Sequence, residues 1–181
     1  RLRYQNPKKP PMNIYILRHG EAEPATAALQ DANRPLTQRG KRGIESIVKV
    51  TRRIKLVPDV IFTSPLLRAR QTAEIASSIL KCRRVEQTKH LNPTARPDLI
   101  WKELCALKNV NHVVLAGHEP HLSQLIGFLL VAPIMIDLKK GSLVRIETKP
   151  NHTPPRGVLK WMLTPRLGTA LLLPECNPIY T

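Results

Sequence analysis

Cysteine and aromatic residues are scarce in this sequence. Three of its 181 residues are cysteine, and aromatic residues make up 4% of the chain. Cys82, Cys105 and Cys176 lie far apart and form no CxxC pair, which argues against a disulfide framework or a zinc knuckle and favours free thiols in a reducing compartment. The chain carries no zinc-finger or base-stacking signature, so nucleic acid is not the expected partner.

Long apolar runs are also missing. The longest, Leu122 to Leu138, is interrupted by Gly127 and Pro133 before it reaches the ~20 residues of a membrane span, so no membrane partner is expected. Residues 1–11 are basic and proline-rich without the apolar run of a secretory signal. We interpret them as a flexible basic tail or as sequence upstream of a natural start at Met12, and we expect a cytoplasmic protein.

Acidic residues are few compared with basic ones. Lys and Arg total 29 against 13 Asp and Glu, which gives a formal net charge of +16. Such an excess of positive charge attracts anions. A phosphorylated substrate is one interpretation, and a solvated basic surface that serves solubility is the other.

Strand and helix signals alternate along the rest of the chain. This order favours a parallel or mostly parallel sheet with helices on its faces, and 42% hydrophobic residues suffice for one domain over residues 12–181. The expected strands cover 13–17, 60–62, a short segment near 85, 113–116 and a terminal pair at 143–147 and 158–163. The expected helices follow residue 37, run from 64 to about 80, and cover about 99–107 and 120–130.

Capping residues refine two of these helices. Thr37 is a candidate N-cap for a helix whose core-facing stripe is Ile44, Ile47, Val48, Thr51 and Ile54. Ser64 and Pro65 supply an N-cap and a first-turn proline for the next helix, whose apolar side comprises Ala69, Thr72, Ala73, Ala76, Ile79 and Leu80.

Candidate phosphate ligands follow three of the strands. Arg18 and His19 end the first, Arg68 comes just after the second, and His118 ends the strand 113–116. Open α/β sheets place ligand sites at the carboxyl ends of their strands, so these side chains converge if the three strands are parallel neighbours. Guanidinium groups bind phosphoryl oxygens well.

A metal site is the weaker interpretation of these residues. His118 and His121 have the i, i+3 spacing of a zinc pair, but no third ligand stands at a suitable distance in the sequence. We therefore expect neither a metal nor another cofactor.

Four segments together resemble the histidine phosphatase superfamily, also called the phosphoglycerate mutase-like family. Its RHG motif is matched by Leu17-Arg-His-Gly-Glu21, and its LTxxG element by Arg34-Pro-Leu-Thr-Gln-Arg-Gly40. The SPxxRAxQT element corresponds to residues 63–72, and the second-histidine element to Ala116-Gly-His-Glu-Pro120. The short chain, Lys139 to Ser142 and Trp161 to Pro165 are most similar to the compact phosphohistidine phosphatases of the SixA type.

The resemblance implies a three-layer α/β/α sandwich with a mostly parallel central sheet. It also implies that His19 attacks phosphorus and is transiently phosphorylated, while Arg18, Arg68 and protonated His118 hold the phosphoryl oxygens.

The resemblance leaves other residues with open roles. Gly20, Gly117 and Glu21 are candidate substrate-binding residues, and Arg34 is either a further phosphate contact or a surface residue of its loop. No carboxylate stands in Lys89 to Thr94, where many relatives in the superfamily have their general acid. Glu21, Glu23 and Asp31 are acids near the motif, and none matches the donor position.

Two classes of function remain at this stage. The first is a metal-independent phosphatase acting on phosphohistidine in a protein, such as a histidine-containing phosphotransfer domain, or on a small phosphorylated compound. The second is a non-catalytic basic module that binds nucleic acid or an acidic protein. The intact set of Arg18, His19, Arg68 and His118 favours the phosphatase.

Overall fold

The computed structural model describes residues 10–27, 29–150 and 154–173. Most of the predicted tail and Cys176 lie outside them. The strands are β1 (Met12–Arg18), β2 (Val60–Thr63), β3 (Val85–Gln87), β4 (His112–Gly117), β5 (Leu143–Thr148) and β6 (Val158–Leu163). The helices are α1 (Gln38–Arg53), α2 (Leu67–Leu80), α3 (Pro97–Ala106), α4 (His121–Leu130) and α5 (Pro165–Leu172), with short 3-10 turns η1 (Asp31–Asn33) and η2 (Lys89–Leu91).

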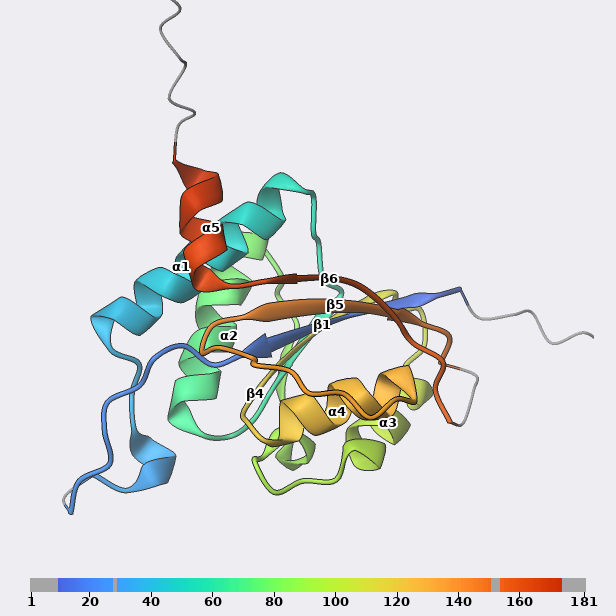
Figure 1. Ribbon diagram of the computed structural model, residues 1–181, viewed down its shortest axis with the longest axis horizontal. Coiled ribbons are helices and arrows are strands. Elements are labelled where there is room, and N and C mark those ends of the chain that lie inside the picture. Colours follow the sequence, from blue (N-terminus) through green and yellow to red (C-terminus); the bar gives the residue numbers. More distant parts are fainter. Residues whose placement is uncertain (1–9, 28, 151–153, 174–181) are drawn as a thin grey trace, which may run out of the picture.

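The strands form one sheet in the order β3-β2-β4-β1-β5-β6 (Figure 1). The first four of these are mutually parallel, whereas β5 and β6 run antiparallel to their neighbours. The predicted mostly parallel sheet with a terminal strand pair is confirmed. β1 and β4 lie at its centre and are almost continuously apolar, as strands covered on both faces tend to be.

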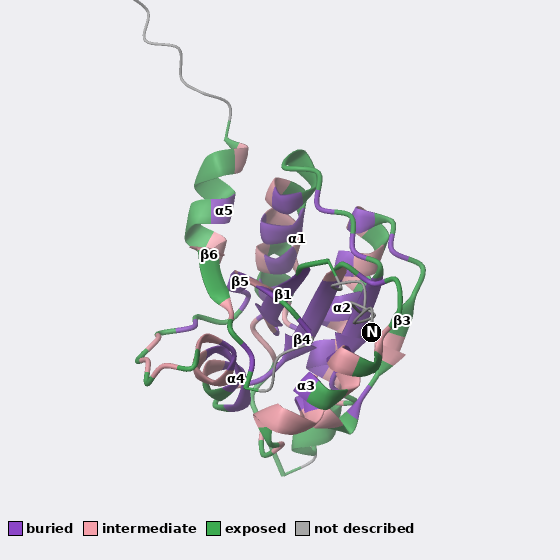
Figure 2. Cartoon of the chain, turned by 90° about the vertical axis from the view of Figure 1, so that its right-hand side faces the viewer, coloured by how far each residue is buried: buried purple, intermediate pink, exposed green. Residues whose placement is uncertain are grey.

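Helices cover both faces of the sheet, which gives the three layers that were predicted (Figure 2). Alternate residues of a strand point to opposite faces, so Ile14 and Ile16 pack with α3 and α4, while Tyr15 and Leu17 pack with α1 and α2. Each face therefore has its own hydrophobic cluster. Of the described helices, none has the length and apolarity needed to cross a bilayer.

The start of the second helix differs from the prediction. Ser64 is not its N-cap, because α2 begins only at Leu67 and Leu66 occupies the cap position; the Ser64 hydroxyl accepts from the Leu66 backbone N–H at 3.4 Å and donates to Asn92 Oδ1 at 2.9 Å. Arg68 is consequently the second residue of the helix, even closer to its N-terminus than expected. The predicted stripe of α1 is buried up to Thr51, but Ile54 lies beyond the last turn and is 58% exposed.

Helix α5 was not predicted. Thr164 caps it by accepting from the Leu167 backbone N–H, and Pro165 occupies its first turn. Gly168 allows the helix to approach α1, since a Cβ there would lie 3.0 Å from Ile47 Cδ1. α5 thereby extends the helical layer beside α1.

Candidate active site

The carboxyl ends of β1, β4 and β2 are level with one another. Arg18 pairs with Gly117, and Thr63 pairs with Ala116. The His19 backbone N–H then donates to the Gly117 carbonyl at 3.0 Å, which continues the ladder by one step. The residues that follow these three strands therefore share one edge of the sheet.

His19 faces His118 at this edge. Their ring centroids are 4.9 Å apart, and the two side chains are nearly buried. His19 Nδ1 lies 2.7 Å from the Gly20 carbonyl, which can only accept, so Nδ1 carries the proton. This hydrogen bond fixes the ring and leaves a lone pair on Nε2. At 6% exposure, the His19 ring is recessed just beyond the end of its strand.

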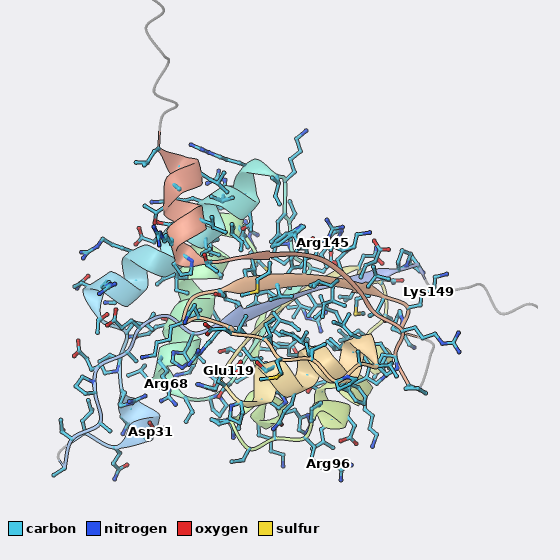
Figure 3. The ribbon with its side chains drawn as sticks, in the orientation of Figure 1. Asp31, Arg68, Arg96, Glu119, Arg145 and Lys149 are labelled. Atoms are coloured by element: carbon cyan, nitrogen blue, oxygen red, sulfur yellow. The ribbon has the colours of Figure 1, made fainter. Side chains whose placement is uncertain are left out.

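Arg68 enters the site from the first turn of α2. Its guanidinium is held by Asp31 of η1: Nη1 donates to the Asp31 carbonyl at 2.7 Å and Nη2 to Oδ2 at 3.1 Å (Figure 3). Arg68 Nε is buried and has no hydrogen-bond partner among the described residues. One guanidinium N–H thus stays available for an oxyanion.

Arg18 is held by the loop that precedes β5. Its guanidinium donates to the Leu138 carbonyl, and the Gly141 N–H donates to the Arg18 and His19 carbonyls at 3.1 and 3.0 Å. Its buried Nε, like that of Arg68, finds no partner in the described part of the chain. A buried arginine and a half-buried one, each with an unpaired Nε–H beside two histidines, form a typical arrangement for binding a tetrahedral oxyanion.

The two histidines are neutral near pH 7. Burial is the main cause that lowers the pKa of His19 to about 4, and Arg68, Arg18 and Lys140 lower it further against the opposing effect of the Gly20 carbonyl. Burial, followed by the positive charge of its neighbours, lowers the pKa of His118 to about 2. The protonated His118 implied by the resemblance is therefore not the resting form.

The glycines of the motifs serve packing. A Cβ on Gly20 would lie 2.8 Å from the Gly40 carbonyl, and one on Gly117 would lie 3.0 Å from Leu122 Cδ2. Neither glycine has a positive φ, so neither is needed for a left-handed turn. Thr72, the last residue of the SPxxRAxQT element, links that element to the RHG motif, since its Oγ1 accepts from the Gly20 N–H at 3.3 Å.

Arg34 and Glu21 form ion pairs with residues other than the two histidines. Arg34 Nε pairs with Asp31 Oδ1 at 3.1 Å and so reaches Arg68 only through Asp31. Glu21 is ion-paired with Arg39 at 3.5 Å. Their predicted roles in substrate binding stay predictions.

Three charged residues near the site were not assigned a role from the sequence. The positive charge of Lys140 helps to lower the pKa of His19, and the negative charge of Glu119 opposes the lowering of the Arg18 pKa by burial. Glu119 Oε2 accepts from Ser123 at 2.6 Å, while its Oε1 is buried without a partner in the described ranges. Asp31 was noted only as a spare acid. Adjacency of Glu119 to His118 in the sequence was the one available signal.

Metal-ligating side chains do not cluster in the described ranges. No group of three or more His, Cys, Asp or Glu there is placed to hold a metal ion. His121 is buried with both ring nitrogens unpaired to any described residue, and burial lowers its pKa to about 4.

Comparisons with known proteins agree with this geometry. Residues 14–95 match the family model of the histidine phosphatase superfamily (branch 1). An uncharacterized protein of Picosynechococcus sp. is 33% identical over 115 residues, which covers 62% of this chain and 70% of that protein. Phosphohistidine phosphatase SixA of Escherichia coli is 28% identical over 159 residues, covering 85% and 94% of the two chains.

Solved structures give the same result. The structure of the protein histidine phosphatase SixA complexed with tungstate superposes with a TM-score of 0.76 and 26% identity. The superposition covers 86% of this chain and 98% of that one. The sheet and the helical layers described above are therefore shared with that protein.

Proposed function

Because this chain belongs to the histidine phosphatase superfamily, a superfamily of phosphatases, we propose that it is a metal-independent protein phosphohistidine phosphatase with His19 as nucleophile. The observation that carries the proposal is the hydrogen bond from His19 Nδ1 to the Gly20 carbonyl at 2.7 Å. It leaves Nε2 unprotonated on a ring whose centroid lies 4.9 Å from that of His118 and which is within the electrostatic reach of Arg68 and Arg18.

The reaction has two steps. In the first, His19 Nε2 forms a bond to phosphorus while the bond from phosphorus to the leaving nitrogen breaks, and the leaving imidazole keeps that electron pair with a proton taken from solvent. In the second, water forms the new oxygen–phosphorus bond, the Nε2–phosphorus bond breaks with its electron pair returning to Nε2, and the water gives up a proton to solvent. Arg18 and Arg68 stabilise the phosphoryl oxygens in both steps.

Bound substrate shifts the protonation equilibrium of His118. Its pKa of about 2 reflects burial and the positive charge of Arg68 and Arg18. A phosphoryl dianion between these groups raises that pKa by Coulomb attraction and so favours the imidazolium form of His118. The imidazolium then donates a hydrogen bond to a phosphoryl oxygen.

The similarity to SixA supports the choice of substrate. SixA is a phosphohistidine phosphatase by name, and its structure contains tungstate, a tetrahedral oxyanion with the shape of phosphate. A small-molecule phosphomonoesterase of the same superfamily is the alternative. A cytoplasmic location and a single catalytic domain over residues 12–181 belong to the same proposal.

Rapid quench of a single turnover tests the covalent route. Wild-type enzyme mixed with radiolabelled phosphohistidine should carry label that is acid-labile and base-stable, and His19→Gln should carry none. His112→Gln is the control, since that histidine begins β4 opposite Asn13, at the far end of the strand from His118. Label that persists in His19→Gln, or activity that EDTA removes and zinc or magnesium restores, would contradict the proposal.

A further inference from the structure

A large groove adjoins the candidate active site. Its volume is about 1120 Å³. The walls are the first two turns of α1, the loop 137–141 that precedes β5, and the start of α5. Arg18 and Gly20 also line it, so the groove opens directly from the catalytic strand end.

The groove is strongly basic. Besides Arg18, its lining contains the cations Arg39, Arg42, Lys139, Lys140 and Arg166 and only two acids, Glu21 and Asp137. Both acids are ion-paired within the groove, Glu21 with Arg39 and Asp137 with Lys139. No acidic side chain of the described residues forms an ion pair with Arg42, Lys140 or Arg166. The groove thus keeps an uncompensated positive charge.

Two helix N-termini add to this potential. α1 begins at Gln38 and α5 at Pro165, and the first turns of both helices line the groove. The N-terminal ends of helices carry partial positive charge and unpaired N–H groups. Side chains and backbone therefore favour the same ligand, which is anionic.

The floor of the groove suits a polypeptide. Gly43 lines it, and a Cβ there would meet nothing closer than Pro165 Cβ at 3.7 Å, so a ligand backbone can approach α1 closely between the flanking cations. The volume also exceeds the roughly 300–1,000 Å³ of sites for small molecules. An acidic stretch of protein matches the volume of the groove and its charge better than a single phosphate does.

We propose that this groove binds acidic residues next to the phosphorylated residue of a protein substrate. The inference rests on the proposed function and names the partner chemistry that the site would select. Arg18 lies at the junction, so a chain whose phosphoryl group sits at His19 continues into the groove. Asp or Glu side chains there meet Arg42 on one wall and Arg166 on the other.

Two phosphohistidine peptides test the proposal. They are identical except that the acidic peptide has three Glu next to the phosphohistidine and the neutral peptide has three Gln there. The double variant Arg42→Glu/Arg166→Glu should raise KM for the acidic peptide about tenfold or more, because two attractions become repulsions. Its kcat, and its kcat/KM for the neutral peptide and for phosphoramidate, should stay within about twofold. Arg83→Glu/Lys108→Glu is the control variant, because it changes the net charge by the same amount at exposed positions outside the groove lining.

The controls separate failure of the groove from failure of the proposed function. An equal loss for both peptides, or the same loss in Arg83→Glu/Lys108→Glu, would overturn the inference. The inference would also be overturned if tripolyphosphate bound to the groove while the acidic peptide failed to bind. Fluorescence anisotropy of the unphosphorylated acidic peptide needs no catalysis, so it tests the groove even if phosphohistidine is not a substrate.

Discussion

Asp31 binds the guanidinium of Arg68 at two points, through its backbone carbonyl at 2.7 Å and its carboxylate at 3.1 Å. The same carboxylate pairs with Arg34 at 3.1 Å. A residue of the loop between β1 and α1 thus orients an arginine that begins α2. Asp31 itself is 61% exposed at its side chain, which limits what the ion pair contributes to stability.

Asp31→Ala tests this positioning role. The backbone contact remains and the carboxylate contact is lost, so we expect kcat to fall about fivefold, the equivalent of roughly 1 kcal/mol. KM and the melting temperature should change little. Arg34→Ala, which leaves Asp31 on Arg68, is the control. A larger loss in Arg34→Ala than in Asp31→Ala would instead make Arg34 a direct phosphate contact.

His19→Ala should abolish turnover and leave the fold intact. The ring ends a strand and belongs to neither hydrophobic cluster, so its removal takes away the nucleophile without opening the core. Steady-state assays with phosphohistidine and a circular dichroism spectrum measure the two parts. Turnover above background in a folded variant would disprove the assignment.

Stability should fall as the pH drops from about 6.5 towards 4. His19 and His121 have folded pKa values of about 4 against an ordinary 6.5, so the unfolded chain binds protons first in this window. Each such histidine gives a slope of about 1.4 kcal/mol per pH unit, with full stability above pH 6.5. Urea unfolding at pH 7, 6 and 5 measures it, and His19→Asn should flatten the slope.

Gly40→Ala and Gly43→Ala form a matched pair on α1. A Cβ at Gly40 would lie 2.0 Å from the Glu21 carbonyl, whereas one at Gly43 meets nothing closer than Pro165 Cβ at 3.7 Å. We expect Gly40→Ala to destabilise by about 1–3 kcal/mol. Gly43→Ala should be neutral or stabilise by up to about 1 kcal/mol, since alanine favours helix. Equal effects in urea unfolding would contradict the close approach of Glu21 to α1.

Leaving groups should be discriminated strongly. Lys89 to Thr94 carry no carboxylate, and general acid catalysis supplies typically ~10²–10⁴-fold for poor leaving groups. Phosphohistidine and aryl phosphates should therefore have kcat/KM values at least about 100-fold above those of alkyl phosphates. Comparable values would mean that an acid reaches the leaving oxygen, and Glu119→Gln and Asp31→Asn would then identify it.

The sequence predicted most of the sheet because its signals are local. β1 and β4 are short apolar runs that are followed by a histidine, and Thr37, the cap of α1, stands directly before its helix. Its errors arose where a distant partner decides the outcome. Ser64 looks like an N-cap, but α2 begins only at Leu67, and the Ser64 hydroxyl also donates to Asn92, a contact that no local pattern indicates.

Within the candidate site, sequence order predicted which residues meet, and the structure supplied what holds them. Arg18, His19, Arg68 and His118 meet because β1, β2 and β4 end level, although their catalytic roles stay predictions. The contact of Asp31 with Arg68 depends on the path of a loop, which periodicity does not describe. The buried oxygen of Glu119 depends on how β4 turns into α4.

The strand order also sets when this site can form during synthesis. β4 lies between β1 and β2, yet residues 64–111 are made after β2 and before β4. At ~5–20 residues per second, the ribosome takes a few seconds over that stretch. During this interval the nascent chain holds two apolar strands whose shared neighbour does not yet exist. Until β4 inserts between them, Arg68 and His19 belong to separate halves of an unfinished sheet.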